Sequence, residues 1–123
     1  MTAIPQEAEH GVWVEPASRH CPPFQATVEL VGRRWSGAII LAASRGSTRY
    51  SDFLAAVPKL SERLLAQRLR ELESAQVLAR NVVPTTPVQV RYELTEWGRE
   101  LAEAVQPLVR WGERWIAGDD EHI

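Results

Sequence analysis

The fold is decided by the stretch LSERLLAQRLRELE, Leu60–Glu73, where leucines and arginines recur at the spacing of an amphipathic helix. At about 100° per residue, the leucines at 64, 65, 69 and 72 gather on one side, the predicted buried face. Arg63, Gln67 and Arg70 fall on the opposite side. Arg and Gln carry planar groups that match base edges in the major groove, and Ser61 is a suitable N-cap. The stretch therefore has the pattern of a recognition helix, with Arg63 in its first turn.

Arg68 differs from the other two arginines because it falls on the flank of the leucine face. We expect it to form a structural ion pair with an acidic residue on another helix, and not to contact bases. The alternative for the whole stretch is a solvated face with ion pairs three residues apart, such as Arg70 with Glu73. The flanking segments help to decide between these interpretations.

The chain before the quoted stretch predicts three further helices. Prolines break up the first 23 residues, and an apolar stripe at helical spacing follows them. Tyr50 is assigned to the apolar face of the third helix, together with Phe53. The expected elements are a helix from Pro23 to Gly32, an apolar central helix from Trp35 to Ser44, a very short strand at Ser47–Arg49 and a short helix from Tyr50 to Val57.

Two valine-rich segments, Val77–Val83 and Val88–Leu94, follow the quoted helix and are joined by PTTP, which predicts a β-hairpin. Thr95 then caps a long final helix that runs to about residue 117, with Pro107 inside it. A short helix, a tight turn, a polar-faced helix and a hairpin describe a winged helix-turn-helix. The expected fold class is mainly α with a small β-hairpin (α+β).

Positive charge is concentrated around the quoted helix. Residues 33–91 hold ten Lys and Arg against four Asp and Glu, a net charge of +6, whereas residues 1–32 carry −3 and residues 92–123 carry −5. A basic centre suits a polyanion such as double-stranded DNA. In the hairpin we expect phosphate or minor-groove contacts, and the alternative is an exposed hairpin without that role. The predicted DNA contacts are Lys59, Ser61, Arg63, Gln67, Arg70, Arg49, Arg80, Thr85, Thr86 and Arg91.

Length and composition exclude several classes of protein. The 123 residues fit one domain, and no apolar run approaches the ~20 residues of a membrane helix. The first residues lack the pattern of a secretory signal, and the single cysteine, Cys21, fits a reducing cytoplasm. We expect no metal site, no cofactor and no enzyme activity, because no cluster of ligands and no pairing of nucleophile and base can be assembled.

The first and last helices carry more apolar surface than one small domain easily covers. Trp111 and Trp115 would otherwise leave a large apolar area in water. These stripes predict a homodimer, and the alternative is that they pack on the core of the same chain. The predicted interface residues are Phe24, Val28, Val31, Leu101, Leu108, Trp111 and Trp115.

The order of several motifs resembles one known family. CPPF, LVGRRWSGAIIL, RYSDFLAAVPKLSERLLAQRLRELESAQVLAR, PVQVRYELTEWGREL and LVRWGERW are similar to the HxlR-type bacterial winged-helix transcription regulators, over about residues 21–115. The resemblance implies a homodimer held by its first and last helices, a recognition helix at Ser61–Ser74 and a wing at Leu78–Leu94. It also implies a redox-sensing position at Cys21, because some members sense electrophiles or oxidants through a cysteine there. GRRW, where a Gly-Gly-Lys-Trp run is common, and a longer arm before the cysteine are departures.

We therefore expect a DNA-binding transcriptional regulator, a repressor, that binds a pseudo-palindromic operator as a homodimer. It would respond to oxidants or electrophiles through Cys21, or to a small ligand. The alternative function is a winged-helix module for protein–protein contact without specific DNA binding. The expected organisation is an N-terminal arm at 1–20, the winged helix-turn-helix domain at 21–117 and an acidic tail at 118–123.

Overall fold

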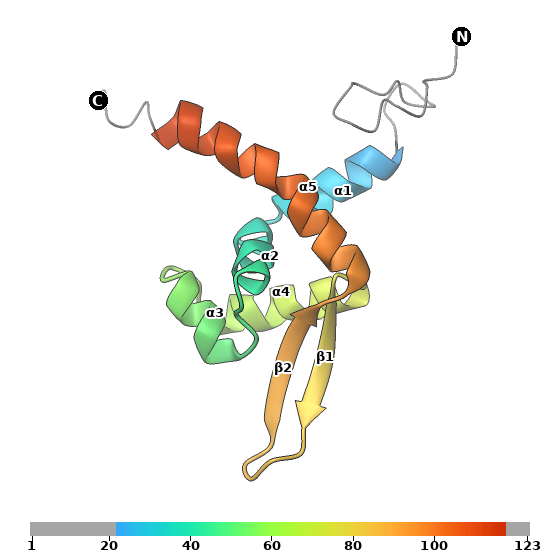
Figure 1. The fold of residues 1–123 in the computed structure, drawn as a ribbon, viewed down its shortest axis with the longest axis vertical. Helices are drawn as coiled ribbons and strands as arrows, with labels where there is room; N and C mark the ends of the chain where they lie inside the picture. The colour runs from blue at the N-terminus through green and yellow to red at the C-terminus, as the bar shows by residue number, and fades with distance from the viewer. Residues whose placement is uncertain (1–21, 118–123) are drawn as a thin grey trace. The chain divides into compact units, whose positions relative to one another are not determined.

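The computed structural model describes residues 22–117 (Figure 1). Cys21, the N-terminal arm before it and the acidic tail at 118–123 lie outside these residues. The helix α1 (Pro22–Gly32) belongs to one unit of the chain, and the residues from Arg33 onward form the other. Pro22 and Pro23 occupy the first turn of α1, where the N–H that proline lacks has no helical partner. No residue of α1 is buried, so its apolar stripe is exposed.

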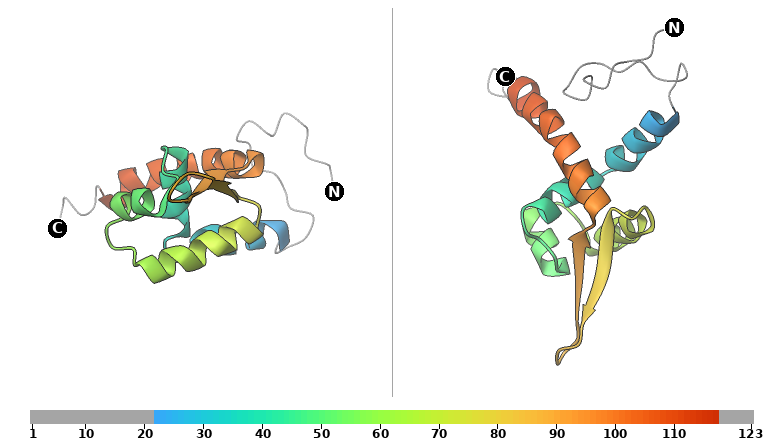
Figure 2. Two further views of the ribbon diagram at one scale, coloured as in Figure 1. Left: turned by 90° about the horizontal axis from the view of Figure 1, so that it is seen from below. Right: turned by 45° about the vertical axis from the view of Figure 1, so that its right-hand side comes forward.

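The second unit is a winged helix-turn-helix, as the sequence predicts. Its elements are α2 (Ser36–Ser44), α3 (Tyr50–Ala56), α4 (Glu62–Ser74), β1 (Leu78–Val83), β2 (Gln89–Leu94), α5 (Glu96–Gly112) and a π-helical turn, η2 (Glu113–Ala117). Figures 1 and 2 show α2 between the α3–α4 pair and α5, with the β1–β2 hairpin projecting away from the helices. The apolar α2 contacts α3, β2 and α5, which explains why it is apolar nearly all round.

The core of this unit comes from the predicted apolar faces. Ile39 and Ile40 of α2 and Phe53 of α3 are fully buried. On α4, which contacts α3, the leucines Leu65, Leu69 and Leu72 are also fully buried. The side of α4 opposite these leucines is consequently held toward solvent.

The expected strand at Ser47–Arg49 is wrong, because no strand is assigned there. The segment still joins the hairpin, since the Tyr92 N–H donates to the Thr48 carbonyl at 2.8 Å. A single backbone bond is too little for a strand, but it ties the start of α3 to β2.

The hairpin and α5 meet at a tight junction. The Thr95 hydroxyl accepts a hydrogen bond from the Gly98 N–H at 3.0 Å, which confirms Thr95 as the N-cap of α5. The Thr95 N–H donates to the Val77 carbonyl at 3.0 Å. A Cβ atom at residue 98 would overlap that same carbonyl oxygen, so only glycine fits. The position of the hairpin is thereby fixed relative to the start of α5.

Candidate nucleic-acid interface

The exposed face of α4 carries the three predicted reading residues. Ser61 is the N-cap, and its hydroxyl accepts from the Leu64 N–H at 3.1 Å. Arg63, Gln67 and Arg70 are exposed. Arg70 forms no ion pair with Glu73 or with any other residue in the part of the chain that is described. The buried leucines fix the helix against the core, and the hydrogen-bond donors of its opposite face are therefore directed toward solvent.

Arg68 lies on the buried flank, as predicted, with 12% of its side chain exposed. The expectation that its acidic partner lies on another helix is wrong. Its guanidinium pairs with Glu71 of the same helix at 3.0 Å, and its Nε donates to the Arg34 carbonyl at 2.9 Å. Glu71 also forms an ion pair with the Arg33 guanidinium at 3.3 Å. Arg68 and Glu71 together hold the loop before α2 against α4.

We expect Arg68→Ala to lower the free energy of unfolding by about 2 kcal/mol, because it removes a charge-assisted hydrogen bond and leaves the Arg34 carbonyl without that donor. The loop it holds includes Trp35, which has a positive φ of 76° that is unfavourable for a residue other than glycine. Thermal and urea unfolding measure the effect. Arg63→Ala, on the exposed face, is the control and should change stability by less than about 0.5 kcal/mol. Equal stability of Arg68→Ala and wild type would contradict a structural role.

The two arginines predicted on the hairpin lie on opposite faces of it. Arg80 pairs across the strands with Tyr92, and Asn81 pairs with Arg91. Residues directly opposite each other share a face, and successive residues alternate, so Arg80 lies on the face of the core residue Tyr92 and Arg91 on the other. Both arginines are exposed. Only Arg80 therefore shares a face with the residue that packs toward α3.

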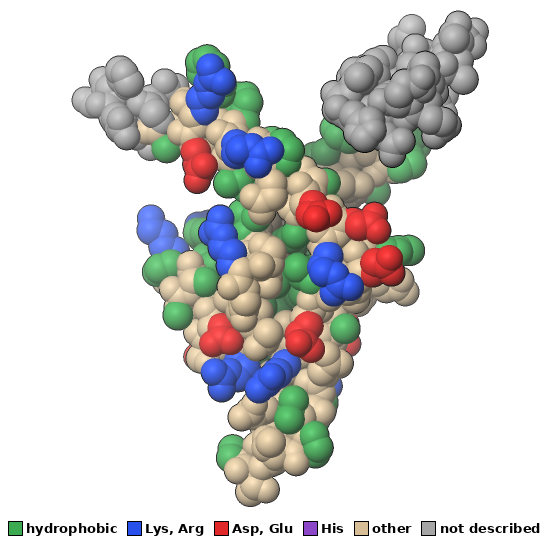
Figure 3. Space-filling model, in the orientation of Figure 1, with side chains coloured by type: hydrophobic (Ala, Val, Ile, Leu, Met, Phe, Trp, Pro, Cys, Tyr) green, Lys and Arg blue, Asp and Glu red, His purple; other side chains and the backbone are tan. Residues whose placement is uncertain are grey.

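The tip of the hairpin is exposed, including Thr85 and Thr86. The Thr85 hydroxyl donates to the Pro87 carbonyl at 2.7 Å, and the Thr86–Pro87 peptide bond is cis. Figure 3 shows hydrophobic side chains near this tip and Lys or Arg side chains closer to the base of the hairpin. The Lys and Arg side chains on this face of the hairpin thus lie closer to its base than to its tip.

Arg49 and Lys59 flank the helix-turn-helix and are both exposed. Arg49 lies 3.8 Å from Asp52, so its charge is partly offset. Asp52 accepts the Arg49 N–H at 3.0 Å and the Thr48 N–H at 3.1 Å. These backbone hydrogen bonds hold the pKa of the Asp52 carboxyl below its usual value, and the bond from the Arg49 N–H has the largest effect. The carboxylate thereby stabilises the first turn of α3.

Tyr50 is a surface residue that the sequence pattern placed on the apolar face of the third helix. It is 37% exposed, and its ring lies 6.2 Å from that of Tyr92, centroid to centroid, at 59°. Burial, and then the neighbouring Tyr92, raise the pKa of its hydroxyl, while Arg70 and Arg80 are near enough to oppose that rise. Its place at the first residue of a short helix, next to a basic residue, is the only sequence signal for this position.

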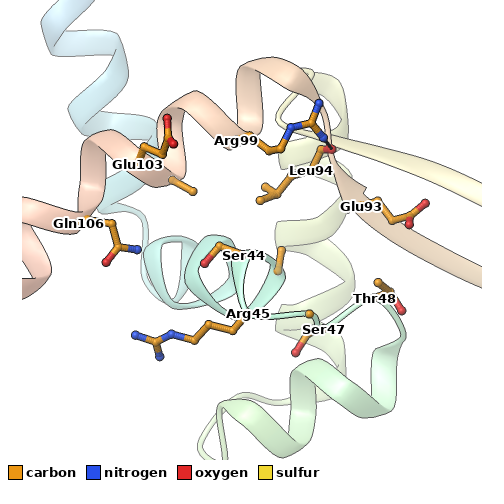
Figure 4. A pocket seen from close by; sticks show the side chains of 12 residues that line it. Ser44, Arg45, Ser47, Thr48, Glu93, Leu94, Arg99, Glu103 and Gln106 are labelled. Atoms are coloured by element: carbon orange, nitrogen blue, oxygen red, sulfur yellow. Dashed lines mark hydrogen bonds between the residues drawn. The ribbon is translucent and has the colours of Figure 1, made fainter.

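A hollow of about 620 Å³ opens between the end of α2, the loop after it, the end of β2 and the start of α5 (Figure 4). Ala43, Leu94 and Ala102 form its apolar part, and Arg45, Arg99 and Gln106 are among its polar residues. Thr48 also lines the hollow, and it is the residue bonded to both Tyr92 and Asp52. A molecule bound here would touch the loop between α2 and α3, which is hydrogen-bonded to the wing through Thr48 and Tyr92.

The apolar residues of α5 divide between two faces. Gly98, Ala102 and Val105 are buried against the rest of the unit. Leu108, Trp111 and Trp115 are 63%, 54% and 51% exposed, and Leu101 is partly buried. Trp97, 66% exposed, falls on the same side as these three at about 100° per residue, and sequence reasoning missed it. Within residues 33–117, the exposed tryptophans are therefore not covered by the core of their own chain.

Two further features are absent from the described residues. No helix between residues 22 and 117 is long and apolar enough to cross a membrane. No group of three or more His, Cys, Asp or Glu side chains within this range is arranged to hold a metal ion.

Comparison with known proteins gives consistent matches. A model of the HxlR-like helix-turn-helix family matches residues 30–120. The chain is 40% identical over 99 residues to the uncharacterized HTH-type transcriptional regulator YvaP of Bacillus subtilis (strain 168), a match that covers 80% of this chain and 92% of YvaP. Reduced YodB from B. subtilis has a TM-score of 0.70 and 36% identity, over 78% of this chain and 94% of that chain. The reduced redox regulator HypR has a TM-score of 0.71 and 32% identity, over 79% and 98%. YodB also has diamide-treated and quinone-bound structures.

Proposed function

The chain belongs to the HxlR-like helix-turn-helix family, and we propose that it is a sequence-specific DNA-binding repressor that acts as a homodimer. The observation that carries this proposal is the exposed Arg63–Gln67–Arg70 face of α4 over a fully buried leucine face. The relatives support the regulatory class, since both YvaP and YodB are HTH-type transcriptional regulators.

In the proposed complex α4 enters the major groove with its first turn toward the bases. Arg63 and Gln67 would read purine edges through paired hydrogen bonds. The Gln67 amide is held only by a 3.5 Å contact with Glu71, so it is free to turn toward a base. Lys59 and Arg80, both exposed, would contact phosphates on either side. The assignment follows from their position beside α4 and at the base of the wing.

The homodimer is supported by the apolar residues that the described chain leaves uncovered. Leu108 and Trp111 of α5 and Trp115 of η2 are exposed, as is the Phe24–Val28 stripe of α1. Val31 and Leu101 are partly buried members of the same two sets. Contact between two copies through these helices would place two recognition helices in successive major grooves, about 34 Å apart.

The proposal is tested by measuring the affinity for a selected site and for a random duplex at two salt concentrations. We expect the selected site to bind at least about 1,000-fold more tightly. Both affinities should fall steeply with salt, because Lys and Arg displace counterions from phosphates. Absent binding, or binding insensitive to salt, would favour a protein–protein module instead.

We also propose that Cys21 is the sensor of this regulator. It is the only cysteine of the chain and directly precedes Pro22, the first residue of α1. The start of a helix favours a thiolate, and Arg19 and His20 add positive charge nearby in sequence. An oxidant or electrophile as the signal is supported by two relatives. YodB has reduced, diamide-treated and quinone-bound structures, and HypR is described as a redox regulator. A lone thiolate would add to a quinone, or two would be oxidised to a disulfide between subunits.

We expect a quinone to lower the operator affinity of the wild type by at least about tenfold, and to leave Cys21→Ser unchanged, because serine is not nucleophilic enough to add. Gel-shift titration with and without the quinone measures this. Mass spectrometry of the treated protein identifies whether Cys21 carries the adduct. An equal response of both proteins, or no response, would exclude Cys21 and direct the search to a ligand site such as the hollow beside Thr48.

A further inference from the structure

Tyr50, at the start of α3, is a partly exposed aromatic residue that packs beside the hairpin. Its ring packs on Tyr92 with the centroids 6.2 Å apart. Tyr92 is buried, so it provides a fixed support for a ring that is itself partly exposed. The Asp52 carboxylate, which binds the N–H groups of Thr48 and Arg49, fixes the backbone on which Tyr50 is carried. The Tyr50 ring is therefore supported by the hairpin, while the residue remains partly exposed.

Two exposed arginines from different elements are electrostatic neighbours of Tyr50. Arg80 is the direct cross-strand partner of Tyr92, so its side chain leaves the hairpin on the face that packs against Tyr50. Arg70 lies on the exposed face of α4. Both arginines lower the pKa of Tyr50 against the larger effect of burial, so both positive charges act at this residue. Neither arginine forms an ion pair within the described part of the chain.

The chemistry of this cluster suits one kind of ligand. Arginine offers only donors, and the Tyr50 phenol, whose pKa lies above its ordinary value of about 10, is neutral and can donate at neutral pH. Three donors from three elements, with two positive charges, match a tetrahedral oxyanion. A base edge would present donors as well as acceptors, which fits this set less well.

On the premise of the proposed function, we propose that Tyr50, Arg70 and Arg80 form a binding site for one phosphate of the DNA backbone. Tyr50 donates a hydrogen bond to this phosphate where α3, α4 and the wing converge, and so fixes the register of α4 in the groove. Arg70 then belongs to the contacts that position the protein, whereas Arg63 and Gln67 belong to those that read sequence.

The test compares Tyr50→Phe with wild type on the selected site and on a random duplex. Removing the hydroxyl while keeping the ring should weaken binding about fivefold to tenfold, equally on both duplexes. The salt dependence should be unchanged because no charge is lost, whereas Arg80→Ala should reduce the salt slope by about one.

Single methylphosphonate substitutions in the site locate the contacted phosphate, because each removes one charged acceptor. At one position per half-site the substitution should weaken DNA binding by the wild type, and it should weaken DNA binding by Tyr50→Phe much less. Unchanged affinity of Tyr50→Phe, a loss confined to the selected site, or the absence of a coupled phosphate would overturn the inference while leaving the proposed function intact. If wild type bound neither duplex, the proposed function would fail first, and this phosphate site with it.

Discussion

Leu108→Lys should convert the protein to a monomer and weaken operator binding by more than about 100-fold. Leu108 is 63% exposed and lies between Trp97 and Trp115 on the uncovered face of α5. A buried ammonium group at an interface without a partner charge is strongly unfavourable. The monomer would bind two half-sites as separate molecules and lose the gain from their linkage. Sedimentation at micromolar concentration gives the oligomeric state, and anisotropy titration gives the affinity.

The choice of lysine makes the result decisive. An added positive charge favours DNA by electrostatics, so a large loss of affinity cannot come from charge alone. Gln106→Lys adds the same charge on the opposite side of α5 and should remain dimeric, with affinity within about threefold of wild type. A Leu108→Lys protein that stays dimeric, or a monomer that binds the operator as tightly as wild type, would refute the proposed interface.

Arg63→Ala and Gln67→Ala should each weaken binding to the selected site by about 1–3 kcal/mol, or roughly 5- to 150-fold. On a random duplex the loss should be much smaller, because a side chain that reads a base makes no matched pair there. The selected site should also become tolerant of substitution at the base that the missing side chain contacted. Competition titration against a set of single-base variants measures both effects.

Lys59→Ala is the matched control for this pair of variants. It lies just before the same helix and is exposed, and we assign it to a phosphate. Its loss should be equal on selected and random DNA and should reduce the salt slope by about one. If Arg63→Ala behaved like Lys59→Ala, Arg63 would be a phosphate contact and the reading face would have to lie elsewhere.

The helical elements could be predicted because their apolar residues repeat at the period of a helix. The leucines of α4 define a buried face, and the opposite face then contains Arg63, Gln67 and Arg70 without further information. The same periodicity placed Arg68 on the flank. It could not identify the Arg34 carbonyl as a partner, because that contact joins positions 34 residues apart through the tertiary fold.

Other features depend on registers and surfaces that composition does not determine. Side chains alternate between the two faces of a strand, so the faces of Arg80 and Arg91 can be assigned only when the pairing of Arg80 with Tyr92 is known. The PTTP turn is compatible with several pairings of the two strands. The interface residues predicted on the last helix combined the partly buried Leu101 with the exposed Leu108 and omitted Trp97. Tyr50 resembled a core aromatic because a pattern of three or four residues cannot show that the first residue of a short helix extends beyond the core.

The proposal of sequence-specific binding by a dimer is tested most directly by selecting bound duplexes from a random DNA pool. The full-length protein would be used in its reduced state. We expect enrichment of one motif made of two inverted half-sites whose centres lie about one helical turn, or a multiple of it, apart. A single unpaired half-site would contradict the dimer. A pool that remains random after repeated rounds would contradict sequence-specific binding, and with it the reading role of Arg63 and Gln67.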